Sequence, residues 1–94
     1  MFVVLLSYIK PIEEVDALMR DHVAWLSKQY EAGRFVVSGR QIPRAGGVIV
    51  ARGDDRKEME DIAASDPFVT GGVATVEVVH FRASQIADGF DALP

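Results

Sequence analysis

The chain has 94 residues, which suits a single domain, because two separate cores within this length would each be too small to be stable. Apolar residues make up 49% of the sequence, so we expect a folded protein, and a net charge of −4 argues against a broad surface for nucleic acid or anionic membranes. Cysteine is absent, which excludes disulfides and thiolate chemistry. The apolar run at residues 2–6 is too short to cross a bilayer, and we expect a cytoplasmic protein.

The first third of the chain predicts a strand followed by a long helix. Residues 2–8 are β-branched and aromatic, and Pro11 ends the extended run soon after them. Glu13 and Glu14 favour the positive end of a helix, which ends near Gly33, where glycine accepts a left-handed conformation. The apolar face of this helix recurs every three or four positions, at Val15, Leu18, Met19, His22, Trp25, Leu26 and Gln29.

The rest of the chain predicts three strands and a second helix. Residues 34–39 and 47–52 are expected to form strands joined by a hairpin loop at residues 40–46, which contains proline and glycine. Apolar residues on one side of residues 54–65 predict the second helix. Residues 73–81 are rich in β-branched side chains and predict the fourth strand.

These elements follow the order βαββαβ, which predicts an α+β fold of the ferredoxin-like type. The expected sheet is antiparallel and four-stranded, with the first and third strands at its centre and two helices on one face. We assign residues 1–81 to this domain and residues 82–94 to a tail that forms a short helix or docks as an arm on a partner subunit. The first strand has the pattern of a strand buried on both faces, so we expect the uncovered face to pack against a second copy in a homodimer.

No pattern in the sequence predicts a metal or a cofactor. The two histidines, His22 and His80, lack metal-ligand spacing, and His80 falls near the end of an outer strand, where we assign it no role. Gly46-Gly47 and Gly71-Gly72 are turn pairs without the surrounding residues that bind phosphate. We therefore expect neither a metal site nor a nucleotide site.

His22 and Asp66 are the candidates for a catalytic pair. An imidazole on the apolar face of a helix loses hydration, so His22 is either a core histidine bonded to the backbone or a general acid or base. A carboxylate would fix its tautomer, and Asp66 is a candidate for this partner. Asp66 precedes Pro67, a position typical of an aspartate that caps the following amides. One carboxylate can perform both roles, because it has two oxygens.

Other candidates would form the walls of a pocket. Three aromatic residues serve as core residues, or as pocket walls if they converge near His22: Tyr8, Trp25 and Phe68. Arg40 and Arg44 flank Pro43 in the hairpin loop and are either solvated charges or donors to a substrate carboxylate. We expect a small-molecule ligand to contact Tyr8, Ser38, Gly39, Arg40 and Phe68.

Four motifs resemble the YciI-like, or YCII-related, family: His22 in the first helix, Ser38-Gly39, Pro43-Arg44-x-Gly46-Gly47-Val48-Ile49 and Asp66-Pro67-Phe68. The resemblance covers residues 1–81 and implies a dimeric α+β barrel with His22 and Asp66 as the active-site pair. Many relatives carry Ser-Gly-Pro where this chain has Ser-Gly-Arg40, which changes the shape and charge of the expected pocket rim.

The resemblance implies a lyase or isomerase that acts on a small cyclic or chlorinated aromatic-derived compound. In this hypothesis His22 transfers a proton, Asp66 orients the imidazole, and Ser38 with nearby backbone donors binds a developing oxyanion. The alternative is a non-catalytic module with the same dimeric fold, which binds a small ligand or supports an assembly. A monooxygenase of the same barrel group is a third possibility that no particular residue favours.

Overall fold

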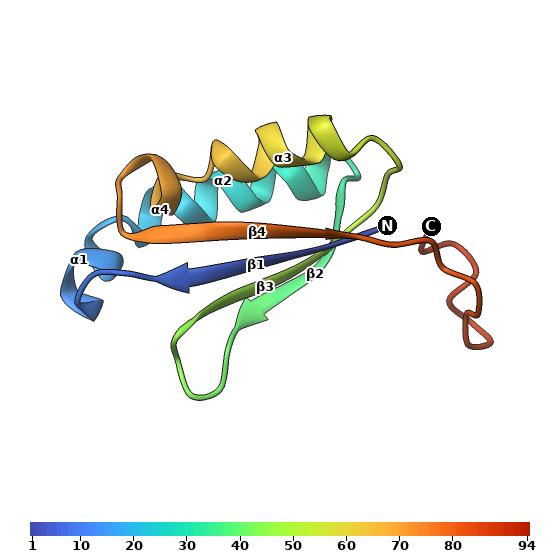
Figure 1. Ribbon diagram of the computed structural model, residues 1–94, viewed down its shortest axis with the longest axis horizontal. Helices are drawn as coiled ribbons and strands as arrows, with labels where there is room; N and C mark the ends of the chain where they lie inside the picture. The colour runs from blue at the N-terminus through green and yellow to red at the C-terminus, as the bar shows by residue number, and fades with distance from the viewer.

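The computed structural model describes residues 1–94 and contains one antiparallel four-stranded sheet (Figure 1). The strands lie in the order β2-β3-β1-β4, so the first and third strands are central, as the sequence predicts. Their bounds are β1 Phe2–Tyr8, β2 Phe35–Arg40, β3 Gly46–Ala51 and β4 Ala74–His80. This arrangement confirms the predicted α+β, ferredoxin-like fold class.

Two longer helices, α2 (Met19–Glu31) and α3 (Arg56–Ala64), cover one face of the sheet (Figure 1). Asp55 caps α3, because its side chain accepts a hydrogen bond from the backbone N–H of Glu58 at 3.1 Å. The other face of the sheet carries no helix in this chain. The fold therefore places every helical side chain that reaches the sheet on a single side of it.

The first helical segment is divided in two, so the prediction of one continuous helix is wrong. Helix α1 (Ile12–Ala17) ends at Leu18, whose φ of −104° and ψ of 3° lie outside the helical region. Helix α2 then begins at Met19. A Cβ added to Gly71 would meet the Leu18 Cδ1 atom at 2.4 Å, which shows how closely Leu18 packs against that glycine. The break therefore lies at a residue that packs against a segment distant in the sequence.

A short helix, α4 (Pro67–Thr70), follows α3. The sequence predicts a break here with Asp66 as a cap of the following amides, and the structure shows that this cap starts a short helix. Pro67 occupies the first turn, where its missing N–H costs no hydrogen bond. Asp66 lies between the two helices.

The hydrophobic core lies between the sheet and the helices. Along β1, Phe2, Val4 and Leu6 are buried towards the helices, and Val3 and Leu5 alternate to the other side. Val3 lies opposite both Val50 and Val79, and Leu5 lies opposite Val48, so these residues share the uncovered side. We name this surface the open sheet face; its apolar residues are Val3, Leu5, Val37, Val48, Val50 and Val79.

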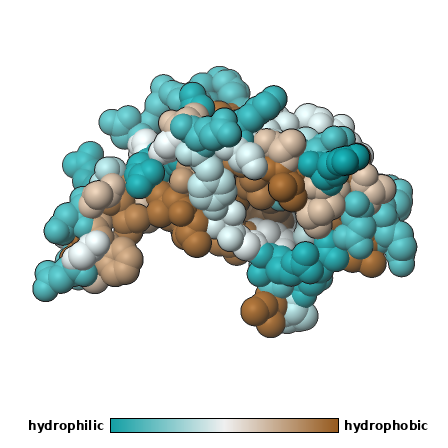
Figure 2. Space-filling model, turned by 180° about the vertical axis from the view of Figure 1, so that it is seen from behind, coloured by the Kyte–Doolittle hydropathy of each residue, from teal (hydrophilic) through white to brown (hydrophobic).

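The open sheet face is apolar although it is not covered within the chain. Figure 2 shows brown, apolar atoms below the polar helical layer, in the stretch between the projecting hairpin and the C-terminal tail. Val37 is 56% exposed and Val79 is 40% exposed, so part of this surface meets solvent in the single chain. Contiguous exposed apolar surface of this kind marks an interaction site in monomeric folds.

The tail after β4 contains neither a helix nor a strand. It leaves the sheet beside the N-terminus, where the Met1 amino group donates to the Phe81 carbonyl at 2.8 Å (Figure 1). The Arg52 Nε atom donates to the Leu93 carbonyl at 2.8 Å and tethers the end of the tail. Phe90 remains 55% exposed, so the tail does not bury its own aromatic side chain. None of the helices is both long enough and apolar enough to span a membrane.

Candidate active site

The structure brings His22 and Asp66 into direct contact. The His22 Nδ1 atom and the Asp66 Oδ1 atom are 2.8 Å apart, although the residues are 44 positions apart in the sequence. His22 is 9% exposed and Asp66 is fully buried. An ionised carboxylate only accepts hydrogen bonds, so a neutral imidazole that donates to an ionised Asp66 in this contact carries its proton on Nδ1 and leaves Nε2 without one.

Asp66 is positioned by the start of helix α4. Its Oδ1 atom also accepts a hydrogen bond from the backbone N–H of Phe68 at 2.9 Å, so the carboxylate caps the helix while it holds the imidazole. The Asp66 carbonyl accepts from the N–H groups of Val69 and Thr70, which fixes the backbone at the same point. The Oδ2 atom is buried without a hydrogen-bond partner. The Asp66 carboxylate therefore both caps α4 and contacts His22.

Aromatic side chains hold the His22 ring in place. The Phe68 ring stacks on it with a centroid distance of 4.0 Å and an angle of 6°. Trp25 lies on the same helix, and the centre of its ring is 5.8 Å from the centre of the His22 ring. The Trp25 indole N–H donates to the Ser65 hydroxyl at 3.0 Å, and this bond links α2 to the residue before Asp66. The imidazole is therefore constrained by stacking as well as by its carboxylate.

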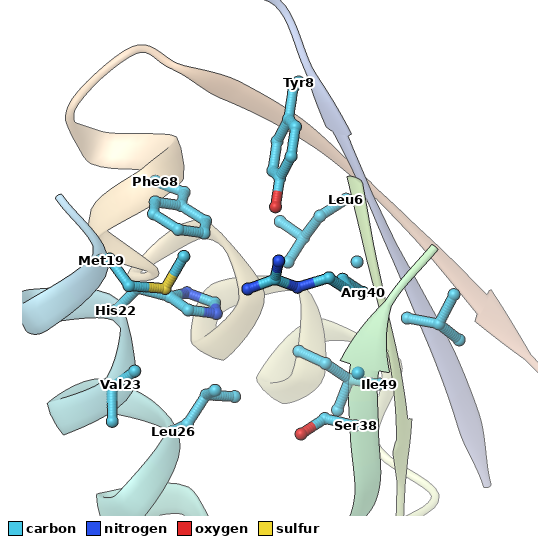
Figure 3. Close-up of a pocket in the computed structure, with 13 residues that line it drawn as sticks. Leu6, Tyr8, Met19, His22, Val23, Leu26, Ser38, Arg40, Ile49 and Phe68 are labelled. Carbon is cyan, nitrogen blue, oxygen red and sulfur yellow. The ribbon is translucent and has the colours of Figure 1, made fainter. Parts of the chain in front are cut away.

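A cavity of about 210 Å³ opens beside the His22 ring. It lies between helix α2, the short helix α4 and the strands β1, β2 and β3 (Figure 3). Figure 3 shows His22 projecting from α2 into this space with a ring nitrogen directed inward. The lining residues are Leu6, Tyr8, Met19, His22, Val23, Leu26, Ser38, Gly39, Arg40, Gly47, Val48, Ile49 and Phe68.

All five residues expected from the sequence to contact a ligand lie in this lining: Tyr8, Ser38, Gly39, Arg40 and Phe68. Trp25 does not line the cavity and instead supports it from behind. Arg44 binds the Asp16 carboxylate at 2.7 Å and lies 5.6 Å from the centre of the Tyr8 ring. The hydrogen bond that Arg44 donates to the Asp16 carboxylate raises the pKa of Arg44 above its usual value, with a smaller contribution from Tyr8. His80 stacks on Phe2 outside the cavity.

The sequence did not identify the helical wall of the cavity. Met19, Val23 and Leu26 line it together with His22. Their spacing of three and four residues was visible for Met19 and Leu26, but a helical apolar face does not by itself distinguish core from pocket. Tyr30 was also missed: its hydroxyl lies 2.6 Å from the Ser38 Oγ atom and positions that side chain.

The lining contains arginine and histidine but no acidic side chain. Asp66 stands behind the His22 ring and does not reach the cavity surface. No group of three or more His, Asp or Glu side chains converges in the structure to hold a metal ion. The polar groups in the lining are therefore the His22 imidazole, the Arg40 guanidinium and two hydroxyls, those of Tyr8 and Ser38. The other walls are mostly apolar.

The model of the YCII-related domain matches residues 1–82 of the chain. The chain belongs to the YCII-related domain family. No protein with a curated function matches its sequence significantly. Among solved structures, this YCII-related chain is similar to the 5-chloro-2-hydroxyhydroquinone dehydrochlorinase TftG from Burkholderia phenoliruptrix AC1100, in complex with 2,5-dihydroxybenzoquinone. The TM-score is 0.69 and the identity 15%, over 87% of this chain and 94% of that chain, so the two proteins share the fold.

Proposed function

We propose that this YCII-related protein is a lyase or isomerase that needs no cofactor and uses His22 for proton transfer. The observation that carries the proposal is the 2.8 Å contact between His22 Nδ1 and Asp66 Oδ1 at the wall of an open cavity. A fixed imidazole tautomer with a free nitrogen towards a ligand is the arrangement that general base catalysis needs. A positioned base of this kind contributes about 10²–10⁴-fold to the rate.

In the proposed mechanism the Nε2 atom of His22 removes a proton from a hydroxyl group or ring carbon of the substrate. Asp66 stabilises the imidazolium that forms, because it already accepts the Nδ1 proton. Electron density moves to a ring oxygen, where Ser38 donates a hydrogen bond while its hydroxyl is held by Tyr30. In an elimination the leaving group departs as an anion and the proton passes from Nε2 to solvent. In an isomerisation the proton returns to another atom of the substrate.

The size and walls of the cavity support a substrate of one small ring. An apolar cavity of about 150 Å³ is enough for benzene, and the cavity here measures about 210 Å³. Leu6, Leu26 and Phe68 give it apolar walls. TftG carries a dihydroxybenzoquinone in its structure and is named for a chlorinated hydroxyhydroquinone, which supports a hydroxylated ring as the substrate class.

The proposed assembly is a homodimer formed through the open sheet face. Pairing this face with its copy would remove Val37 and Val79 from water. The 82–94 tail leaves the domain at the same end as the N-terminus and carries the exposed Phe90, which supports its docking on the partner subunit. This arrangement would give a dimeric α+β barrel.

A non-catalytic ligand-binding module is favoured by one observation. The Asp66 carboxylate caps α4, so the pair contributes to the structure whether or not a proton is transferred. The two functions differ in what they predict for His22, because only an enzyme needs its free nitrogen.

The test is turnover of chlorinated and unchlorinated hydroxyhydroquinones by the wild-type protein and by His22→Gln. Chloride release and solvent deuterium incorporation would report elimination and isomerisation separately. We expect turnover of at least one compound and a loss of about 10²–10⁴-fold in His22→Gln. Retained turnover in this variant would reject the role of His22, and binding without turnover by the wild type would favour the non-catalytic module.

A further inference from the structure

We propose that the substrate carries a carboxylate, which the Arg40 guanidinium binds inside the cavity opposite His22. This inference rests on the proposed function, since it names the class of compound that the same site takes. Among the hydroxylated rings proposed above, it favours those that carry a carboxylate, such as a hydroxylated benzoate, over neutral ones. Three features of the structure support it: the direction of Arg40, its lack of a partner and the charge of the lining.

Arg40 is directed into the cavity by its place in the sheet. It ends β2 and lies opposite Gly47 of β3, which has no side chain to fill the space between them. Figure 3 shows the guanidinium extending from the strand across the cavity, with His22 and Phe68 on the far side and the Tyr8 hydroxyl above it. All four residues line the same cavity. A ligand between Arg40 and His22 would contact both.

The Arg40 guanidinium makes no hydrogen bond or ion pair within the chain. Arg44, four residues later, is bound by the Asp16 carboxylate at 2.7 Å, so it is not free to bind a ligand in the same way. A guanidinium presents paired N–H donors that match the two oxygens of a carboxylate. Arg40 therefore offers this pair of donors to a molecule in the cavity.

The charge of the lining is the third feature. The chain has a net charge of −4, yet none of the thirteen lining residues is acidic. Asp66 does not line the cavity, and its Oδ1 atom contacts both His22 Nδ1 and the Phe68 N–H. An anion in the cavity would thus meet Arg40 without a competing acidic side chain in the lining.

The position of the carboxylate would also serve the reaction. A ligand anchored at one end by Arg40 presents the rest of its ring to His22, and such anchoring orients the reacting atoms. Two contacts on opposite sides of the cavity would leave the ring little freedom to rotate. Arg40 would act in binding and orientation, and His22 in proton transfer.

The experiment measures binding of 2,5-dihydroxybenzoate and its neutral analogue 2,5-dihydroxybenzamide by NMR titration. We expect the wild type to bind the benzoate about tenfold more tightly or better, since charge-assisted hydrogen bonds are stronger than neutral ones. Arg40→Met should remove this preference and Arg40→Lys should reduce it. Arg20→Met is the matched control, because it deletes the same charge from an exposed position of α2 outside the cavity, and it should keep the preference.

Four outcomes would overturn the inference. They are no binding of the benzoate, equal binding of the two compounds, an unchanged preference in Arg40→Met, and equally tight binding of acetate, which would indicate a site for any anion. The result is separable from the proposed function because binding requires no turnover. His22→Gln should lose activity and keep the carboxylate preference, whereas Arg40→Met should lose the preference and keep the His22–Asp66 hydrogen bond.

Discussion

At the residue scale, Asp66 links folding to the proposed chemistry. One of its oxygens accepts hydrogen bonds from both the His22 ring and the Phe68 backbone. The α4 helix that it caps also supplies the Phe68 ring, which stacks on His22. The carboxylate therefore positions the imidazole directly through Nδ1 and indirectly through the helix that carries its stacking partner.

Replacement of Asp66 by alanine should lower the free energy of unfolding by about 1–3 kcal/mol. The substitution removes a helix cap and leaves the buried Nδ1 atom of His22 without its acceptor. Chemical denaturation would measure the loss. Asp66→Asn is the matched variant: it retains an oxygen that can cap α4, so it should be the more stable of the two. Equal stability of Asp66→Ala and the wild type would contradict this account.

The residues of the site were predictable in part. His22 attracts notice because an imidazole on an apolar face needs a partner, and Asp66 because it precedes a proline. Their distance and the cavity between the elements depend on how helices and strands pack, which one sequence does not encode locally. The Tyr30–Ser38 contact was missed for the same reason, since it joins α2 to β2 across the fold.

At the element scale, the strands were predicted better than the helices. Alternating β-branched residues and the proline- and glycine-containing loop placed all four strands within one or two residues. The helical pattern gave no sign of the break at Leu18, which packs closely against Gly71, a residue distant in the sequence. Helix α4 was missed because four residues are too few to show a period.

The hairpin strand β3 depends on the absence of a side chain at Gly46. A Cβ added there would lie 1.7 Å from the Leu6 carbonyl oxygen on the neighbouring strand. We expect Gly46→Ala to lower the free energy of unfolding by about 1–3 kcal/mol or more, since two backbones must separate. At Gly39 a Cβ would meet no atom within 4 Å, so Gly39→Ala is the control and should not destabilise. Thermal melting that ranks the two variants in the opposite order would refute the argument.

At the scale of the whole molecule, the fold covers only one face of its sheet. The core lies on the helical side, and the open sheet face leaves apolar residues such as Val37 in contact with water. The uncovered apolar face could be predicted from the order of the elements and from the first strand, which is apolar on both of its faces. The identity of the covering surface is a proposal, and it concerns a second copy of the chain.

We expect the wild type to sediment as a dimer at micromolar concentration and Leu5→Lys to sediment as a monomer. Leu5 lies on the open sheet face, so a charge there would be buried without a partner in the dimer and solvated in the monomer. Ala24→Lys adds the same charge on the exposed side of α2 and should leave the dimer intact. Circular dichroism would verify that both variants fold. A monomeric wild type would contradict the proposed assembly.

The proposed role of His22 can be tested without knowledge of the substrate by locating the proton on its imidazole. The 2.8 Å contact with Asp66 predicts that the neutral imidazole carries its proton on Nδ1 and leaves Nε2 unprotonated towards the cavity. Nitrogen-15 NMR of the labelled imidazole distinguishes the two tautomers. We expect the Nδ1–H form in the wild type and a loss of this preference in Asp66→Ala. A neutral His22 protonated at Nε2 in the wild type would contradict it, since the cavity would then face a hydrogen-bond donor and no base.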